Sequence, residues 1–224
     1  MKYTIAYLYY DLLNLYGDNG NIKALYNRLS NQKLKVEIKY LSVGDKKDFS
    51  KYDLVYIGSG TDKNLEIALN DLINYKDDIK KAIKENKNFL ITGNALELFG
   101  KYILKDNKKI KCLNTLNFYT EYKKRCVKDI KYSCKLIDSK IIGFENHNGM
   151  IISKEKPLFE NNEGIIYKNF IGTYIIGPLL IRNPEFCKYY IRKIILDKKK
   201  DFKIKDDNYS LEELAYKENI ESII

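Results

Sequence analysis

The sequence predicts an α/β fold in which helices flank a mostly parallel central sheet. In the first half of the chain, short apolar runs alternate with longer segments that place apolar residues at helical spacing. In the second half, several short β-like runs follow one another between residues 109 and 174 without such segments. These runs predict extra, partly antiparallel strands on one side of the parallel sheet.

The first three elements are expected close to the N-terminus. Residues 3–10 form an apolar, strand-like run, and residues 20–30 place their apolar side chains on one face of a helix. Residues 34–41 alternate apolar and charged side chains, which predicts a half-buried strand.

The next elements repeat this order. Residues 53–58 are a continuous apolar run, which is typical of a strand covered on both faces. Residues 64–86 form a helical pattern that we expect to be interrupted near residues 75–77. Another buried strand, at residues 88–92, leads through a tight Thr-Gly-Asn turn into a helix-like pattern.

Two helices are expected after the β-rich segment. The first spans residues 183–196, where Asn183 can cap the helix and Pro184 suits its first position. The second spans about residues 210–224 and opens with a capping-box pattern. Because the sequence contains no internal repeat and no low-complexity linker, residues 1–224 are expected to form a single domain.

The composition favours a globular protein without a nucleic-acid or membrane role. Hydrophobic residues make up 45% of the 224 residues, which allows a sizeable core. The net charge is +10, but lysine is mixed with aspartate and glutamate, so we expect no nucleic-acid binding. No apolar stretch approaches the roughly 18 residues of a membrane span, so we expect no membrane insertion.

The cysteines predict reduced thiols and no metal centre. The four cysteines lie at positions 112, 126, 134 and 187, and no two of them have C-x-x-C spacing. The chain has a single histidine, His147, which argues against a cluster of cysteine and histidine ligands. We therefore expect a cytoplasmic protein with no bound metal and no cofactor.

Six short stretches carry the chemistry that the sequence offers. Three of them follow predicted parallel strands, so their loops are expected to share the crevice at the carboxyl ends of those strands. The six stretches are LNLYGDNGNI (13–22), YIGSGTD (56–62), TGNALELFGKY (92–102), LNFYTEYKKR (116–125), IGFENHNG (142–149) and IGTYIIGPLL (171–180).

In this order and spacing, the stretches resemble class I glutamine amidotransferases of the cobyric-acid-synthase type, from residue 13 to about residue 180. Within that group they are most similar to the glutaminase subunits of lipid II isoglutaminyl synthases. The resemblance implies a flavodoxin-like fold and a heterodimer with a Mur-ligase-like subunit. It also implies a role in peptidoglycan synthesis, where such a subunit supplies ammonia for amidation of the D-glutamate of lipid II.

Two positions depart from the Cys–His pair of that family. In that family the cysteine lies on a sharp strand-to-helix turn, the elbow, whose sequence reads roughly C-G-G-Y-Q-x-x-G. Counting back from Gly100 puts Gly93 at the cysteine position. The late family motif reads G-T-Y-x-H-G-P, and Ile176 stands where the histidine belongs. Glycine offers no nucleophile and isoleucine moves no proton, so we expect no conventional glutaminase activity.

Several polar positions of the family pattern are retained, and the resemblance makes them candidates for binding glutamine. Arg125 matches an arginine that is implied to hold the glutamine carboxylate, although it also fits a solvated position in a basic run. The glycine-rich loop is expected to contribute backbone N–H groups to an oxyanion site. The other candidates, which also fit structural turns, are Gly58, Ser59 and Gly60 in that loop, Asn94 at the elbow, and Glu145, Asn146 and His147 in an ENH loop.

Two functions are compatible with these residues, and they leave open whether the chain is an enzyme. The first is a non-catalytic subunit that keeps the fold in order to dock on a Mur-ligase-like partner. The second is an active amidotransferase, of the cell-wall or the cobyric-acid branch, with an unconventional nucleophile in the same crevice. An unrelated small-molecule-binding domain has less support, because Gly58-Ser59-Gly60 forms no G-x-G-x-x-G pattern at a helix start.

Overall fold

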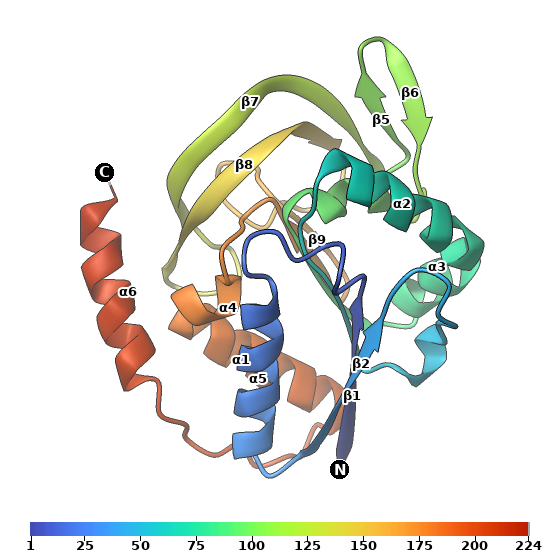
Figure 1. Cartoon of the computed structure of the whole chain (residues 1–224). Helices are drawn as coiled ribbons and strands as arrows, with labels where there is room; N and C mark the ends of the chain where they lie inside the picture. The colour runs from blue at the N-terminus through green and yellow to red at the C-terminus, as the bar shows by residue number, and fades with distance from the viewer. Residues whose placement is uncertain (224) are drawn as a thin grey trace.

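The structure is a computed structural model that describes residues 1–223. Its main sheet has the strand order β2-β1-β3-β4-β10-β9, and a second sheet has the order β6-β5-β7-β8. Figure 1 shows the second sheet arching over one end of the first. The strands of the main sheet are β1 (Lys2–Leu8), β2 (Lys35–Leu41), β3 (Leu54–Ile57), β4 (Asn88–Thr92), β9 (Ile165–Tyr167) and β10 (Phe170–Thr173).

The main sheet is parallel except at one edge. Strand β1 pairs in parallel with β2 and β3, and β4 pairs in parallel with β3 and β10. The edge strand β9 runs antiparallel to β10. The carboxyl ends of the parallel strands therefore lie together, and the predicted mostly parallel sheet is confirmed.

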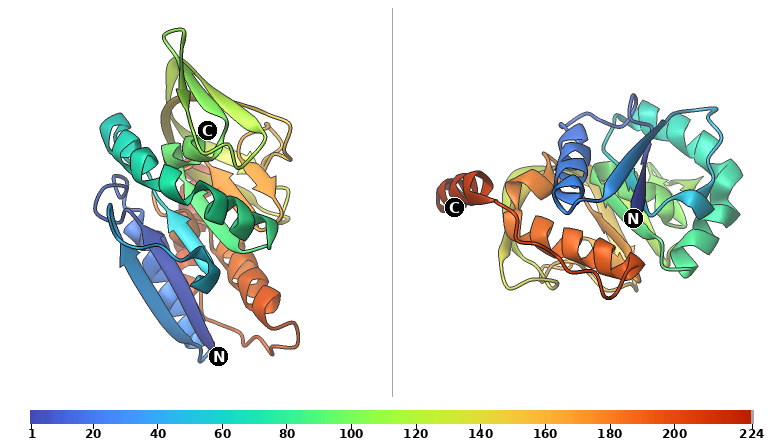
Figure 2. Two further views of the ribbon diagram at one scale, coloured as in Figure 1. Left: turned by 90° about the vertical axis from the view of Figure 1, so that its right-hand side faces the viewer. Right: turned by 90° about the horizontal axis from the view of Figure 1, so that it is seen from below.

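Helices cover both faces of the main sheet (Figures 1 and 2). Ile5 of β1 packs into the cluster that includes α1 and α5, whereas its neighbour Ala6 packs into the cluster that includes α2 and α3. This alternation is what a strand buried on both faces requires. The helical segments before the C-terminal helix are α1 (Asn19–Asn31), η1 (Phe49–Lys51), α2 (Asp62–Leu72), η2 (Ile73–Tyr75), α3 (Lys76–Lys84), η3 (Gly93–Phe99), α4 (Leu179–Arg182) and α5 (Pro184–Lys198).

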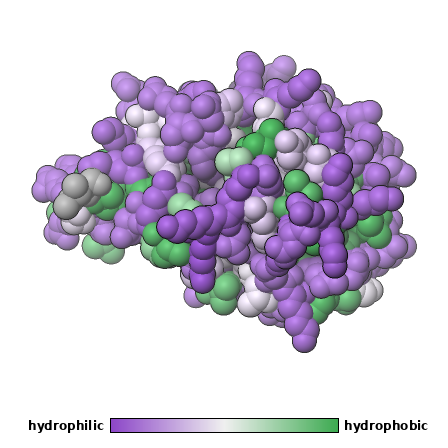
Figure 3. All heavy atoms as spheres, turned by 90° about the horizontal axis from the view of Figure 1, so that it is seen from above, coloured by the Kyte–Doolittle hydropathy of each residue, from purple (hydrophilic) through white to green (hydrophobic). Residues whose placement is uncertain are grey.

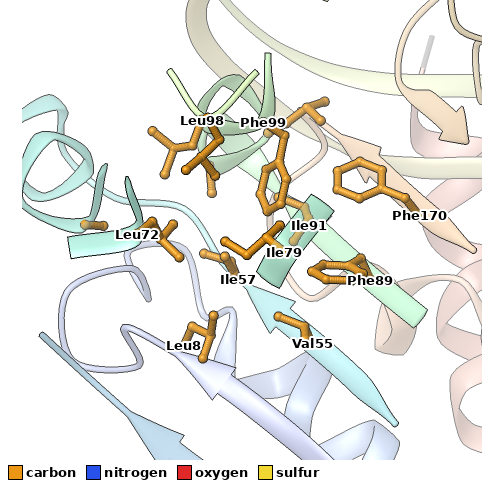
Figure 4. Packing of buried hydrophobic residues seen from close by; sticks show 14 of the residues in the cluster. Leu8, Val55, Ile57, Leu72, Ile79, Phe89, Ile91, Leu98, Phe99 and Phe170 are labelled. Atoms are coloured by element: carbon orange, nitrogen blue, oxygen red, sulfur yellow. The ribbon is translucent and has the colours of Figure 1, made fainter. Parts of the chain in front are cut away.

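Three aromatic rings pack together among aliphatic side chains in one of the cores, as Figure 4 shows. The ring of Phe170 lies 6.0 Å from the ring of Phe89 and 4.9 Å from the ring of Phe99, measured between centroids. All three side chains are fully buried, and each such pair contributes about 0.5–1.5 kcal/mol beyond its area burial. This packing holds the 3-10 helix η3 against the sheet, so the turn before η3 has a defined position.

Two predictions about helical segments are refined by the structure. The predicted helix at residues 64–86 is interrupted by the 3-10 turn η2, which confirms the expected break. The helix-like pattern after β4 forms a 3-10 helix rather than an α-helix, and Gly100 follows it as the C-cap.

The second sheet confirms the predicted antiparallel additions. It contains a long antiparallel hairpin of β7 and β8, whose register shifts between Tyr122 and Cys126. The hairpin curves over the carboxyl-terminal end of the main sheet (Figure 1). The strands of the second sheet are β5 (Tyr102–Lys105), β6 (Lys108–Lys111), β7 (Phe118–Ser133) and β8 (Lys140–Ser153).

Two local predictions are wrong. The first strand ends at Leu8 rather than at residue 10, because Tyr9 has a φ of +54° and begins a turn. The side chain of Asn183 does not cap α5 within the described residues. Its amide oxygen instead accepts from the backbone N–H of Ile142, and its amide nitrogen donates to the carbonyls of Ile142 and Leu179. Asn183 therefore ties α4 to β8.

The C-terminal helix α6 spans Ser210–Ser222, and residue 224 of the predicted helix lies outside the described residues. Its N-cap is Tyr209 rather than Ser210, and Glu213 pairs with Lys188 on α5 instead of completing a capping box. Leu211 is 75% exposed, so this helix adds little to the core.

The surface seen from the β7–β8 side is mostly hydrophilic, and its apolar patches are small and separated (Figure 3). Among the helices of residues 1–223, none combines the length and the apolar character that crossing a membrane requires.

Beneath the second sheet, η3 buries the carboxyl group of Glu97, which is 1% exposed. The hydroxyl of Tyr174 donates to Glu97 Oε1 at 3.0 Å, while Oε2 has no hydrogen-bond partner within residues 1–223. Burial raises the pKa of Glu97 to about 7, although the hydrogen bond from Tyr174 acts in the opposite direction. Ionising this group in the folded state is therefore costly.

We expect Glu97→Gln to stabilise the protein above pH 7. The folded-state pKa lies above the ordinary value of 4.5, so the native protein loses stability as the pH rises from about 4.5 to about 7. At about 1.4 kcal/mol per pKa unit, the loss is on the order of 3 kcal/mol. Urea unfolding of the variant and the native chain at pH 5 and pH 8 measures this difference. The exposed Glu66→Gln serves as the matched control, and an equal pH dependence in all three proteins would contradict the prediction.

Candidate functional site

The turn between β4 and η3 brings Gly93 to the carboxyl-terminal end of the main sheet. Gly93 has a φ of +65°, in the left-handed region that glycine adopts without the Cβ penalty of other residues. Strand, sharp turn and helix form the frame in which many α/β enzymes expose a nucleophile. Here the apex of that frame carries no side chain.

Ile176 lies directly against this apex. A Cβ atom built on Gly93 would lie 2.9 Å from Ile176 Cγ2 and 2.4 Å from Ser59 Cβ. Ile176 is held there because its backbone N–H donates to the carbonyl of Phe144 on β8 at 2.9 Å. The structure thus places residues 93 and 176 next to each other, and neither side chain can transfer a proton or attack a carbonyl.

The side chain of Ser59 fills the space beside the apex. Its hydroxyl donates to Asp18 Oδ2 at 2.9 Å, and Asp18 is only 2% exposed. Asp18 Oδ1 accepts further hydrogen bonds from the hydroxyls of Thr92 at 2.9 Å and Tyr56 at 3.1 Å. Burial raises the pKa of Asp18, while these hydrogen bonds partly offset the rise. One buried carboxyl group therefore connects the first loop to the glycine-rich loop and to strands β3 and β4 beneath the apex.

The backbone of the glycine-rich loop packs so closely against Asp18 and Leu13 that Gly58 and Gly60 have no room for a side chain. A Cβ on Gly58 would lie 2.5 Å from Asp18 Cβ, and a Cβ on Gly60 would lie 2.4 Å from a side-chain carbon of Leu13. Asn94 fastens this loop to the elbow, since its amide donates to the Gly60 carbonyl at 2.8 Å and accepts from the Gly60 N–H at 3.1 Å. The loop and the elbow are therefore one rigid unit, and the Gly60 N–H is already engaged.

A pocket of about 270 Å³ opens between this unit and the β7–β8 hairpin. The guanidinium of Arg125 donates from Nε to Asn146 Oδ1 at 2.8 Å, and Asn146 Nδ2 donates to the Tyr16 hydroxyl at 2.7 Å. The remaining N–H groups of Arg125 form a fork that suits a carboxylate. Glu97 and Ile176 also line the pocket.

Six of the eight predicted binding residues line this one pocket, namely Ser59, Gly60, Asn94, Arg125, Asn146 and His147. Gly58 lies beneath the loop against Asp18, and Glu145 faces a neighbouring cavity. The prediction of an ENH loop is wrong, because residues 145–147 lie within strand β8, paired with residues 126–128 of β7. A strand fixes the direction of these side chains more firmly than a loop does.

His147 is held in one orientation by its neighbours. Its ring stacks on the ring of Tyr174 with a centroid distance of 3.8 Å and an interplanar angle of 4°. Its Nδ1 lies 2.8 Å from the carbonyl oxygen of Gly149. Because a carbonyl oxygen only accepts, Nδ1 carries a proton, and in the neutral ring Nε2 is then an acceptor.

The sequence analysis did not single out Asp18, Glu97, Tyr16 or Tyr174. Asp18 and Tyr16 belong to the first quoted motif, and a buried-site role for Asp18 has a signal in the Gly-Asp-Asn-Gly turn that follows β1. Glu97 lies in the elbow motif among apolar residues, where a carboxyl group is unexpected. A search for charged residues inside apolar helical faces would have found it.

The fold agrees with comparisons to known proteins. The family model for the CobB/CobQ-like glutamine amidotransferase domain matches residues 4–184. The lipid II isoglutaminyl synthase (glutamine-hydrolyzing) subunit GatD of Staphylococcus aureus (strain N315) is 34% identical over 203 residues, covering 85% of this chain and 83% of that protein. The GatD subunit of Streptococcus pneumoniae (strain ATCC BAA-255 / R6) is 33% identical over 200 residues, covering 82% of this chain and 77% of that protein.

Solved structures show the same fold at low sequence identity. A glutamine amidotransferase structure superposes with a TM-score of 0.54 at 12% identity, covering 85% of this chain and 98% of that one. A glutamine amidotransferase from Thermotoga maritima gives a TM-score of 0.53 at 15% identity, covering 97% of this chain and 92% of that one. The family match, the two relatives and the shared fold agree, and the chain belongs to the CobB/CobQ-like glutamine amidotransferase domain family.

Proposed function

We propose that this chain is a glutamine amidotransferase-like subunit that does not hydrolyse glutamine and that docks on a Mur-ligase-like partner. In this role it assists amidation of the D-glutamate of lipid II during peptidoglycan synthesis. The observation that carries the proposal is the contact of Gly93 with Ile176 at the apex of the elbow, where a nucleophile and a base are needed.

The relatives support the pathway and the partnership. Both are named as subunits of a lipid II isoglutaminyl synthase, and the matched region covers more than three quarters of each. A subunit that keeps its fold after losing its chemistry needs another use for that fold, and holding or shaping a ligase is the simplest one. The four cysteines are free thiols, as the reducing conditions of the cytoplasm favour.

The pocket supports binding without turnover. Arg125 supplies a guanidinium for the carboxylate of a ligand such as glutamine, and the ligand's far end would meet Ser59 and Ile176. A bound glutamine would therefore keep its amide intact, and ammonia for the ligase would come from solution or from another source.

We expect the chain to co-elute as an equimolar complex with the Mur-ligase-like protein of its own organism. The complex should amidate lipid II with ammonium salts and not with glutamine, because residues 93 and 176 supply no acyl-transfer chemistry. Size-exclusion chromatography and mass spectrometry of the lipid product measure both outcomes. The ligase alone is the control, and a chain that elutes separately from every such ligase would refute the docking role.

Restoring the chemistry is expected to require three substitutions. Gly93→Cys with Ile176→His alone should be destabilised by about 1–3 kcal/mol, because the new side chain overlaps Ser59 and the backbone is left-handed. Adding Ser59→Gly should relieve the overlap and allow glutamate release in the presence of the ligase. Thermal unfolding and a glutamate assay measure the two effects.

Ser59→Gly in the otherwise native chain is the matched control, and it should release no glutamate. If Gly93→Cys proved as stable as the native chain, Ser59 would not occupy the space that we assign to it.

One contact favours a second candidate function, an amidotransferase with Ser59 as nucleophile. Ser59 lines the pocket and donates to Asp18 at 2.9 Å, and the raised pKa of Asp18 makes its carboxylate a stronger base. Ser59 Oγ would attack the amide carbon of glutamine, and Asp18 would take the hydroxyl proton and pass it to the departing ammonia. Water would then hydrolyse the resulting ester to glutamate.

Two observations favour the non-hydrolysing role over this serine chemistry. Ser59 is only 2% exposed, which leaves little access to its oxygen. Asp18 already accepts hydrogen bonds from Thr92 and Tyr56, and these hydrogen bonds make its carboxylate a weaker base.

The glutamate assay separates the two functions. We expect no glutamate release from the native complex and therefore no change in Ser59→Ala. Release that is present in the native complex, lost by several orders of magnitude in Ser59→Ala and kept in the surface control Ser50→Ala would establish the serine mechanism instead.

A further inference from the structure

We propose that Cys126, Glu145 and His147 form a binding site for a divalent transition-metal cation such as Zn²⁺. The site lies on the β7–β8 hairpin, beside a cavity of about 520 Å³ that all three residues line. The site does not rest on the proposed non-hydrolysing role, although His147 also lines the pocket beside the elbow.

The strand register brings the three side chains together. Cys126 on β7 is paired directly with His147 on β8, and Glu145 lies two residues before His147 on the same face of the strand. Residues 126 and 147 are far apart in the sequence, so the spacing that usually identifies metal ligands is absent here. The single histidine argued against a cluster of cysteine and histidine ligands, and it is the strand register that brings Cys126 and His147 together.

The distances are close to those of a tetrahedral site. Glu145 Oε2 lies 3.5 Å from Cys126 Sγ and 3.8 Å from His147 Nε2, and all three ligand atoms lie within 4.8 Å of one another. Zinc bonds of about 2.0–2.3 Å place neighbouring ligand atoms roughly 3.3–3.7 Å apart. Metal binding would draw these side chains slightly closer together than they lie in this structure.

His147 is already oriented as a metal ligand. Its Nδ1–H donates to the Gly149 carbonyl, which leaves the lone pair of Nε2 directed towards the cluster. Within residues 1–223, Nε2 is buried and has no hydrogen-bond partner. The stacked ring of Tyr174 prevents the imidazole from turning away. A buried acceptor without a partner is costly, and a bound cation would satisfy it.

The charge of the ligand set also fits a dication. A Cys126 thiolate, a Glu145 carboxylate and a neutral His147 together carry a charge of −2, which neutralises Zn²⁺; the thiol proton leaves to solvent when the metal binds. Sulfur and imidazole ligands favour zinc or cobalt over magnesium or calcium. The open fourth position would face the cavity and take a water molecule.

The ammonium group of Lys128 competes with a metal cation for the carboxylate of Glu145. Lys128 Nζ lies 3.5 Å from Glu145 Oε2, and the Lys128 side chain is 52% exposed, so it is free to swing away. Tyr132 donates its hydroxyl to the same carboxylate oxygen at 3.1 Å. Lys123 and Lys124 line the cavity as well. Removing the charge of Lys128 should therefore tighten metal binding.

The experiment uses the full-length chain, reduced and stripped of metal, and measures Zn²⁺ binding by calorimetry and Co²⁺ binding by absorption. We expect one equivalent of Zn²⁺ to bind and Co²⁺ to give a thiolate-to-cobalt charge-transfer band. Cys126→Ser should abolish the band and weaken Zn²⁺ binding by more than the roughly 10–100-fold that loss of an outer-shell partner costs. Cys134→Ser is the matched thiol control and should bind like the native chain.

Lys128→Ala tests the site without removing a ligand, and it should bind Zn²⁺ more tightly than the native chain. A native chain that binds no stoichiometric Zn²⁺ would overturn the proposal. So would Zn²⁺ binding that Cys126→Ser leaves unchanged, since the metal would then sit elsewhere on the protein. Circular dichroism of each variant separates loss of binding from loss of folding.

Discussion

The buried carboxyl group of Asp18 is the interaction on which the crevice depends. It receives hydrogen bonds from the loop after β3 through Ser59, from the end of β4 through Thr92, and from β3 itself through Tyr56. Burying a carboxyl group that is only 2% exposed costs folding free energy unless its oxygens accept hydrogen bonds. The three donor side chains must therefore stay within hydrogen-bonding distance of Asp18. The relative positions of the first loop, the glycine-rich loop and the elbow follow from that requirement.

At the apex of the elbow, neighbouring side chains occupy the space that a side chain on residue 93 would need. Ser59 and Ile176 both lie where the side chain of residue 93 would extend, and the left-handed backbone of Gly93 is compatible with its lack of a side chain. The three residues fit one another sterically, so the surroundings of residue 93 match the absence of a side chain there. A substitution at only one of the three positions would leave the new side chain in steric conflict with the other two residues.

The second sheet determines the character of the pocket. The β7–β8 hairpin carries Arg125, Asn146 and His147 to the rim formed by the main sheet, where Asn146 contacts Tyr16 of the first loop. The register shift between Tyr122 and Cys126 lies beside Arg125, and a bulge of this kind redirects side chains at a binding site. The parallel sheet thus supplies the elbow, and the hairpin supplies the groups that could hold a ligand.

The sequence by itself determined the α/β class, the order of strands and helices, the break between α2 and α3, and the family, because hydrophobic period and glycine-rich motifs are local signals. That Gly93 and Ile176 stand at the two positions of the family's Cys–His pair stays a prediction from the sequence. Only the tertiary structure decided that Ser59 fills the apex, that Asp18 is the shared acceptor, that Asn183 ties α4 to β8 and that Cys126 faces His147. Those contacts join residues distant in sequence, and they depend on strand register and loop geometry, which no local pattern encodes.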